Sequence, residues 1–218
     1  MPRSPSQIIE ELKKDYGRKQ GAIQTRLEEF QRCLIKGESE IFKELCFCIL
    51  AANSSAEMGM KTLAAIEDIV LEADLPTLQQ RLSRGFRYWR VRPSYIVHAR
   101  DYLKKEHGFK LGELLRSFSD HEDRRNFLVF NRDIKGIGFK ESSHFLRNIG
   151  YRGYAILDKH ILNCLCELGL IRKNRKPLSP DRYRRIERKM QAFADRIGID
   201  MDELDLLLWS RKTGKILK

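Results

Sequence analysis

Apolar residues recur along this chain every three or four positions, and no stretch alternates with the period of two that marks a strand. This periodicity predicts a chain made of helices joined by short turns, without internal repeats or a low-complexity linker. The fold class is therefore expected to be all-α. The predicted helices cover residues 8–16, 23–34, 42–50, 54–69, 75–82, 93–103, 109–118, 120–131, 139–148, 158–168, 179–198 and 202–209.

Two of these helices have recognisable starting signals. Ser54 followed by Glu57 fits a capping box, in which the two side chains satisfy backbone amides of the first turn. Asp158 precedes an apolar helical segment and is well placed to cap it, and Gly169 is expected to end that helix.

The amino-acid composition limits the kinds of binding partner that the protein is expected to have. The chain has 218 residues, 42% of them hydrophobic, which suits a globular protein, and its formal net charge is +12. Such a charge favours a polyanion, either nucleic acid or an acidic membrane surface. The membrane is the weaker choice because the longest apolar run, residues 45–52, falls far short of the roughly 20 residues of a spanning helix. The N-terminus lacks an apolar signal-peptide centre, so we expect an intracellular protein.

Five cysteines raise the question of a metal site. They include two Cys-x-Cys pairs, Cys46 with Cys48 and Cys164 with Cys166. Residues two apart on a helix point to nearly opposite sides, so neither pair chelates a metal well. We interpret these cysteines as reduced packing residues and expect no metal site.

Residues 127–150 hold the most informative motif, an apolar helix, a tight turn with the sequence Ile-Lys-Gly-Ile-Gly at 134–138, and a second apolar helix. Gly136 and Gly138 permit backbone conformations that other residues resist, and they allow a DNA backbone to approach closely. The exposed amides of the turn, including that of Ile137, and the positive end of the following helix form an anion site suited to phosphate.

Lys140 and Asp158 are the candidate catalytic pair, and each has an ordinary alternative. Lys140 lies in the first turn after the hairpin, where the helix terminus and partial burial disfavour an ammonium ion and leave more amine to attack carbon. The alternative is a solvated lysine or a phosphate contact. Asp158 is equally consistent with a plain helix cap, although a capping carboxylate can also serve an adjacent site.

Taken together, Lys-Gly-Ile-Gly-Phe-Lys at 135–140 and Leu-Asp-Lys-His at 157–160 resemble the helix-hairpin-helix motifs of the endonuclease III superfamily of DNA glycosylases. The resemblance implies that Lys140 attacks the sugar C1′ of a flipped-out nucleotide and forms a Schiff base. Asp158 would activate the Lys140 amine and stabilise the positive charge that develops on the sugar. β-Elimination would then nick the strand. His160 would contact a phosphate, with a neutral structural histidine as the alternative.

The C-terminus points to one branch of that superfamily. No cysteine follows Cys166, so the chain lacks the four clustered cysteines that hold an iron–sulfur cluster in endonuclease III itself. Instead it ends in Thr-Gly-Lys-Ile-Leu-Lys at 213–218, which resembles the archaeal-type (type 2) 8-oxoguanine DNA glycosylases. The resemblance extends over nearly the whole chain and implies a DNA repair enzyme with glycosylase and lyase activities, from a prokaryotic, archaeal source.

The resemblance also implies how the oxidised base is recognised. Lys218, through its terminal carboxylate, would accept a hydrogen bond from N7, which is a donor in 8-oxoguanine and an acceptor in guanine. Trp209 would stack on the flipped base, and Tyr88 would stack on its other side unless Trp89 faces the DNA instead. Asn53 would fill the gap that the flipped base leaves. Core packing for Trp209 and an ordinary turn for Asn53 are the alternatives.

The same resemblance implies a two-lobed fold. Residues 41–152 would form a central helical barrel with the helix-hairpin-helix at about 120–150, and residues 1–40 and 153–218 would form the second lobe. The active site would lie in the cleft between the lobes. Catalysis would require no cofactor, although a structural monovalent cation could bind hairpin carbonyls. The expected partner is double-stranded DNA containing 8-oxoguanine, bound by a monomer, with part of the basic run at 172–189 along the DNA backbone.

Two other functions remain open. One is the same fold acting on another lesion such as an oxidised pyrimidine, against which the C-terminal residues argue. The other is a non-catalytic DNA-binding module that uses the hairpin only to grip phosphate. Such a module needs neither Lys140 nor Asp158, so the presence of both residues favours an enzyme.

Overall fold

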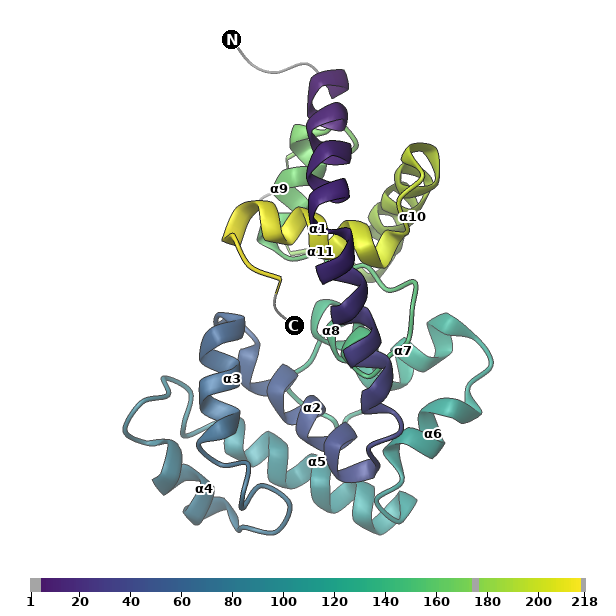
Figure 1. The fold of residues 1–218 in the computed structure, drawn as a ribbon. Coiled ribbons are helices and arrows are strands. Elements are labelled where there is room, and N and C mark those ends of the chain that lie inside the picture. Colours follow the sequence, from purple (N-terminus) through teal and green to yellow (C-terminus); the bar gives the residue numbers. More distant parts are fainter. Residues whose placement is uncertain (1–4, 174–176, 217–218) are drawn as a thin grey trace.

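The helical periodicity of the sequence corresponds to a fully helical chain. The computed structural model describes residues 5–173 and 177–216, and over these ranges it contains eleven helices and no strand (Figure 1). The expected all-α class is therefore confirmed. The helices are α1 (Pro5–Cys33), α2 (Glu38–Ala51), α3 (Ala56–Ala64), α4 (Leu75–Leu82), α5 (Arg92–His107), α6 (Leu111–Ser117), α7 (His121–Phe130), α8 (Phe139–Asn148), α9 (Lys159–Glu167), α10 (Pro180–Ile197) and α11 (Met201–Thr213).

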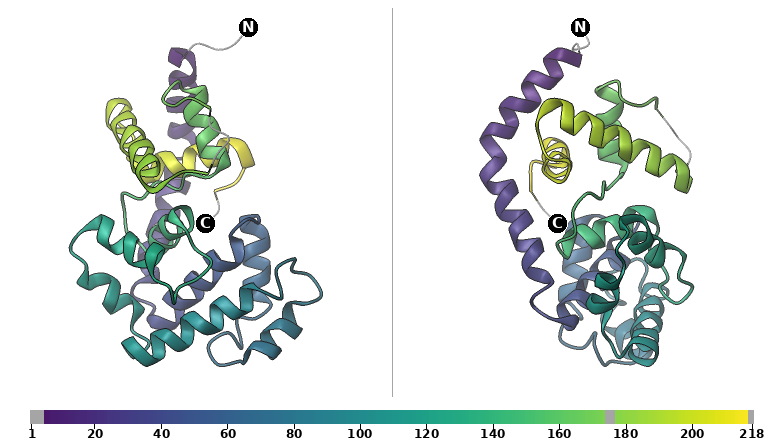
Figure 2. Two further views of the ribbon diagram at one scale, coloured as in Figure 1. Left: turned by 180° about the vertical axis from the view of Figure 1, so that it is seen from behind. Right: turned by 90° about the vertical axis from the view of Figure 1, so that its right-hand side faces the viewer.

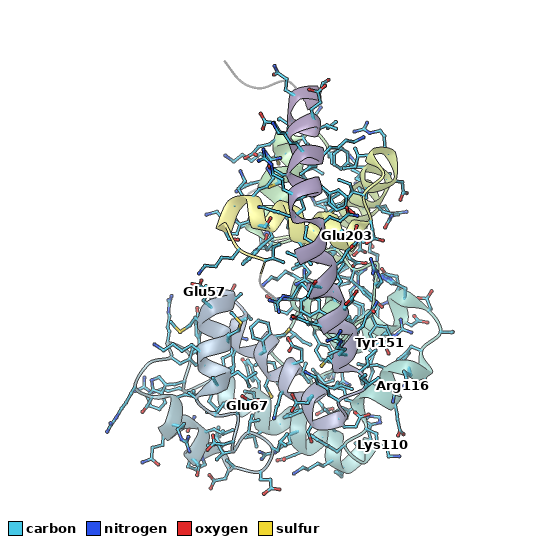
Figure 3. The ribbon with its side chains drawn as sticks, viewed as in Figure 1. Glu57, Glu67, Lys110, Arg116, Tyr151 and Glu203 are labelled. Atoms are coloured by element: carbon cyan, nitrogen blue, oxygen red, sulfur yellow. The ribbon has the colours of Figure 1, made fainter. Side chains whose placement is uncertain are left out.

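The prediction of two separate N-terminal helices was wrong, because α1 is one continuous helix. Its middle is tied to α11 by side chains far away in the sequence. The carboxylate of Glu203 accepts hydrogen bonds from Tyr16 Oη at 2.5 Å and from Gln24 Nε2 at 3.2 Å, and Figure 3 shows Glu203 where the two helices cross. Lys19 Nζ donates to Ser210 Oγ at 3.0 Å. These tertiary contacts outweigh the low helix propensity of two glycines in the segment.

The ends of other helices also differ from the prediction, most clearly those of α3 and α11. Helix α3 begins after Ser55 instead of Ser54, because the hydroxyl of Ser55 accepts a hydrogen bond from the amide of Met58 at 3.1 Å. It ends at Ala64 rather than continuing to residue 69. Helix α11 is longer than predicted at both ends, and Asp200 caps it by accepting from the amide of Asp202 at 2.9 Å. Local propensity was thus right about the presence of these helices and wrong about their ends.

Buried apolar side chains form two clusters. The first core comes from residues 41–154 and joins α2 to α8; the second core comes from residues 12–30 and 155–208 and joins α1, α9, α10 and α11. Figures 1 and 2 show α1 running along both groups of helices. We propose that these two cores are the two lobes expected from the sequence. No helix among the described residues is both long enough and apolar enough to cross a membrane.

Candidate active site

A cavity of about 300 Å³ lies where helices of both cores meet. Helix α8 contributes one wall and α11 another, while the turn between α2 and α3 and the start of α9 complete the lining. Four of the residues singled out from the sequence line this cavity, namely Lys140, Asp158, His160 and Trp209. The structure thus brings together side chains that lie up to 69 positions apart in the chain.

Lys140 enters the cavity from the first turn of α8. Its side chain is 29% exposed, which leaves the amine accessible to a ligand in the cavity, and Nζ lies 3.6 Å from Glu141 Oε1. Another oxygen of the Glu141 side chain accepts a hydrogen bond from the amide of Gly138 at 3.3 Å, at the start of the same helix. One carboxylate therefore contacts both the helix terminus and the lysine.

Asp158 is both a helix cap and a cavity residue. Its Oδ1 accepts a hydrogen bond from the amide of Ile161 at 2.8 Å, which caps α9 as the sequence predicted. The same side chain is half-buried and lines the cavity opposite α8. Capping fixes the carboxylate in place and leaves it in contact with the cavity, so the two interpretations of Asp158 are compatible.

A buried ion pair forms part of the cavity wall. Arg147 Nη1 of α8 lies 2.9 Å from Asp205 Oδ2 of α11, and both side chains are almost completely buried. Asp205 Oδ1 also accepts from the amide of Ile156 at 3.2 Å. Burial raises the pKa of Asp205 to about 7, although the neighbouring Arg147 acts in the opposite direction. The pair connects the helix of Lys140 to the helix of Trp209.

Among the lining residues that sequence analysis missed are His144, Arg147 and Asp205. Their spacing along the helices could have identified them. On α8, positions 140, 144 and 147 share one face, and on α11, positions 205, 209 and 213 share another. Following the face of each candidate residue along its own helix would have predicted this lining.

The cavity also has an exposed edge formed by the C-terminal segment and α3. Lys215 pairs with Glu57, which lies in the first turn of α3 (Figure 3). The two side chains line the cavity and are about 60% exposed, so their mutual attraction is weak in water. Lys218, expected to recognise the oxidised base, lies outside the described residues.

The hairpin at 134–138 is built on the first core. Ile137 is buried there, and its side chain is part of that core. Gly136 has φ +86°, and a Cβ at this position would lie 2.6 Å from Tyr95 Cδ2 and 2.9 Å from Arg92 Nη1. Arg92 donates from Nη1 to the carbonyl of Gly136 at 3.0 Å and from Nη2 to that of Ala52 at 3.4 Å. Glycine at 136 is required both by conformation and by space.

Beside the hairpin lies a second hollow, lined by Asn53, Tyr88, Gly136 and Gly138 among others. Asn53 is exposed and has φ +54°, a turn conformation that asparagine tolerates. Tyr88 lies here and does not line the cavity of Trp209. The guanidinium of Arg92 lies 5.4 Å from its ring centroid, and the same arginine is bonded to the hairpin, which draws Tyr88 to this side. The neighbouring Trp89 packs partly against the first core and stacks with Arg90 at 4.4 Å.

The cysteines and acidic residues form no metal centre among the described residues, where no three His, Cys, Asp or Glu side chains are placed to share an ion. Cys46, Cys48 and Cys164 are buried, and all five cysteines are free thiols. Burial raises the pKa of Cys164 to about 11, so this thiol is protonated at neutral pH.

Comparison with known proteins gives matches over nearly the whole chain. The family model described as 8-oxoguanine DNA glycosylase, Ogg-HhH, matches residues 23–199. The 8-oxoguanine DNA glycosylase/AP lyase of Methanocaldococcus jannaschii is 41% identical over 211 residues, covering 96% of this chain and 97% of that protein. The enzyme of the same name from Korarchaeum cryptofilum is 39% identical over 216 residues, covering 96% and 99%.

Solved structures match equally well. The Methanocaldococcus jannaschii 8-oxoguanine glycosylase/lyase in complex with a 15mer DNA containing 8-oxoguanine has a TM-score of 0.89 at 38% identity, covering 97% of this chain and 100% of that one. The 8-oxoguanine DNA glycosylase of Thermotoga maritima has a TM-score of 0.88 at 36% identity, covering 99% and 100%.

Proposed function

The chain belongs to the helix-hairpin-helix family of 8-oxoguanine DNA glycosylases, and on this premise we propose that it excises 8-oxoguanine from duplex DNA and then nicks the strand. It is a bifunctional enzyme of base-excision repair, a DNA glycosylase and AP lyase. The observation that carries the assignment of catalytic residues is that Lys140 and Asp158, which come from segments of different cores, line one cavity.

Lys140 is the nucleophile. Its neutral amine forms a bond to C1′ of the damaged nucleotide while the C1′–N9 bond breaks, and the base leaves with that electron pair and takes up a proton. The carboxylate of Asp158 stabilises the positive charge that develops on the sugar and receives the proton that the attacking nitrogen loses. Ring opening gives a Schiff base between Nζ and C1′. Loss of a C2′ proton then expels the 3′ phosphate by β-elimination, which nicks the strand.

The flipped base is held in the cavity. Trp209, half-buried on the α11 wall, provides a surface for stacking, and the terminal carboxylate of Lys218 accepts the N7 hydrogen that guanine lacks. Tyr88 and Asn53 act outside the cavity, because they line the hollow beside the hairpin. Asn53 fills the gap in the duplex, and Tyr88 contacts a neighbouring nucleotide there in place of stacking on the flipped base.

The DNA backbone binds to the hairpin amides of Gly136 and Ile137, and to that of Gly138 when this amide exchanges its bond to Glu141 for a phosphate. His160, exposed at the edge of the cavity, contacts a further phosphate. A monovalent cation bound by the hairpin would use carbonyl groups other than that of Gly136, because the positive charge of Arg92 lies 3.0 Å from that oxygen and would repel the cation. The enzyme acts on DNA as a monomer, inside the cell and without a catalytic cofactor.

Borohydride trapping tests this function. Duplexes carrying 8-oxoguanine, dihydrothymine or normal guanine are incubated with the wild type or with Lys140→Gln. We expect a covalent adduct only between the wild type and the 8-oxoguanine duplex. An adduct with dihydrothymine instead would overturn the substrate and keep the chemistry. No adduct on any duplex, despite tight binding, would overturn the lyase activity.

A further inference from the structure

The segment that leads from α8 to Asp158 belongs to neither helix nor sheet. Its backbone amides are instead bound by side chains of the second core. These bonds are Gly153 N to Asp202 Oδ2 at 3.1 Å, Ala155 N to Glu187 Oε1 at 2.9 Å, Ile156 N to Asp205 Oδ1 at 3.2 Å, and Leu157 N to Tyr183 Oη at 3.1 Å. The place of Asp158 is therefore set by side chains of α10 and α11.

The hydroxyl of Tyr183 contacts residues close in sequence to both candidate catalytic residues. Tyr183 Oη accepts from the amide of Leu157, donates to the carbonyl of Ala155 at 2.6 Å, and lies 3.4 Å from Ser143 Oγ. Leu157 directly precedes Asp158, and Ser143 lies three positions after Lys140 on α8. This hydroxyl is completely buried, so water does not replace the contacts it makes.

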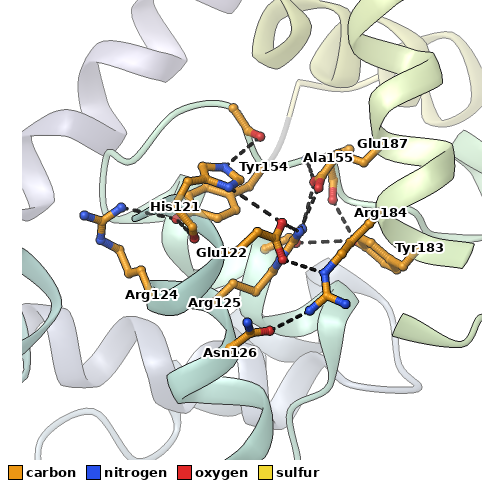
Figure 4. Close-up of polar contacts among 12 residues, drawn as sticks. His121, Glu122, Arg124, Arg125, Asn126, Tyr154, Ala155, Tyr183, Arg184 and Glu187 are labelled. Atoms are coloured by element: carbon orange, nitrogen blue, oxygen red, sulfur yellow. Dashed lines mark hydrogen bonds and ion pairs between the residues drawn. The ribbon is translucent and has the colours of Figure 1, made fainter. Parts of the chain in front are cut away.

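A buried ion pair holds Tyr183 and the segment in place (Figure 4). Arg125 of α7 is fully buried and donates to both carboxylate oxygens of Glu187, at 2.8 and 2.7 Å, and to Ser143 Oγ at 3.2 Å. Its guanidinium lies 5.4 Å from the ring centroid of Tyr183. Arg125 comes from the first part of the chain that also builds the hairpin, whereas Glu187 belongs to α10, so the pair joins the two groups of helices.

We infer that Tyr183 and Glu187 are positioning residues, which fix the carboxylate of Asp158 relative to the amine of Lys140 for base excision. This inference rests on the proposed function. Displacement of a reacting group by about 1 Å can lower a rate by about a hundredfold. The hairpin is anchored in the first core by Arg92 and Ile137, and loss of the Tyr183 hydroxyl leaves the ring that packs against Phe139, next to the hairpin. We therefore expect DNA binding not to depend on this hydroxyl.

Two buried tyrosines provide a matched test. Tyr183→Phe removes the hydroxyl that holds residues 155 and 157. Tyr154→Phe, the control, removes an equally buried hydroxyl that donates to the carbonyl of His121 at 2.8 Å and lies 3.3 Å from Arg124, on the side of α7. Both variants lose hydrogen bonds and little volume. Tyr154 lies in the same segment, but its hydroxyl is bonded on the side of α7. Only the first variant loses the bonds to residues 155 and 157, directly before Asp158.

The measurements are the single-turnover rate of 8-oxoguanine excision at saturating enzyme, the Kd for an 8-oxoguanine duplex, and the melting temperature. We expect Tyr183→Phe to lower the rate about 10- to 100-fold and Tyr154→Phe to lower it less than about threefold. Both Kd values should stay within about threefold of the wild type. Equal rates for the two variants at matched stability would overturn the inference.

A second variant separates positioning from stability. Glu187→Leu alone leaves the buried Arg125 with only the partly exposed Glu122 as a counterion and should destabilise the fold. The double variant Arg125→Met, Glu187→Leu replaces the ion pair by apolar side chains, which often restores stability. It does not restore the bond to the amide of Ala155. We expect the melting temperature to recover while the excision rate stays at least tenfold low. Recovery of both together would show a purely structural role and overturn the inference.

Failure of this inference is distinguishable from failure of the proposed function. If Lys140→Gln still forms the adduct and excises the base, the proposed function fails. If Lys140 is required and Tyr183→Phe matches Tyr154→Phe, the proposed function stands and only the positioning role is lost.

Discussion

The hairpin and the cavity are built in different ways. The hairpin consists of consecutive residues, 134–138, held against the first core by one arginine and two buried isoleucines, Ile134 and Ile137. The cavity takes its lining from the turn after α2, from α8, from the start of α9 and from α11, so that it exists only where both cores meet. The difference indicates that the proposed binding of the DNA backbone is a local property of the chain, whereas the proposed chemistry depends on how the two cores are joined.

The two regions also use charge differently. Near the hairpin, exposed arginines such as Arg87 stack over aromatic rings in contact with water. In the cavity wall, Arg147 and Asp205 are paired out of contact with solvent. Salt should therefore weaken binding at the hairpin and leave the cavity's ion pair almost unaffected. Four predictions test this contrast, and their expected effects decrease in the order given.

The largest effect on the excision rate is expected for a substitution of Asp158, which lines the cavity. Asparagine also caps helices well, so Asp158→Asn should preserve α9 and remove only the charge. We expect the single-turnover excision rate to fall about 10²- to 10⁴-fold with little change in Kd or melting temperature. If the rate stays within about threefold of the wild type, Asp158 is only a cap.

Trp209 should show a smaller effect that is also confined to the cavity. Stacking of a base on an aromatic side chain contributes about 1–3 kcal/mol, so Trp209→Ala should lower kcat/KM for 8-oxoguanine about 5- to 150-fold. Trp209→Phe, which keeps an aromatic ring, should retain most of the activity. Equal losses for the two substitutions would contradict a stacking role.

The hairpin offers a pair of glycines that separate folding from DNA contact. Gly136→Ala should cost about 1–3 kcal/mol of unfolding free energy, because it combines φ +86° with contacts below 3 Å. Gly138→Ala should leave stability within about 0.5 kcal/mol, since its Cβ would lie 3.7 Å from the nearest atom, on Glu141. If DNA approaches closely here, Gly138→Ala weakens binding all the same. Urea unfolding and duplex titration measure the two effects.

The smallest change, counted per pH unit, is expected for the buried pair of the cavity wall. Burial raises the pKa of Asp205 to about 7 from its ordinary value of 3.8. A raised pKa in the folded state stabilises the fold below pH 3.8, and this stabilisation is lost as the pH rises to about 7. The unfolding free energy of the wild type, relative to that of Asp205→Asn, should therefore fall over this range by at most about 1.4 kcal/mol per pH unit. A difference that is constant with pH would show that Asp205 is ionised throughout.

Local sequence predicted the fold class and most helices, and it identified Lys140 and Asp158, which the structure brings to one cavity. Such predictions succeed where a few adjacent residues decide the outcome, as at the hairpin and at the cap of α9. The continuity of α1 could not be predicted, because it depends on bonds between Tyr16 and Glu203, which are 187 positions apart.

The position of Tyr88 also depends on contacts with residues that are distant in the sequence. From sequence it was expected opposite Trp209, but Arg92 contacts both its ring and the carbonyl of Gly136, so Tyr88 lies beside the hairpin. The buried pair of Arg147 and Asp205 was missed for a related reason. Each looks like one more surface charge on its own helix, and only the packing of α8 near α11 shows that the two share a wall.

Parallel measurement of Kd and of the single-turnover excision rate, on one 8-oxoguanine duplex, tests the separation of binding from chemistry most directly. The variants are Lys140→Gln in the cavity and Gly138→Ala at the hairpin. We expect Lys140→Gln to bind with nearly the wild-type Kd and to lose excision. Gly138→Ala should bind more weakly and excise at nearly the wild-type rate once the enzyme is saturating. Proportional losses of both quantities in both variants would contradict the account.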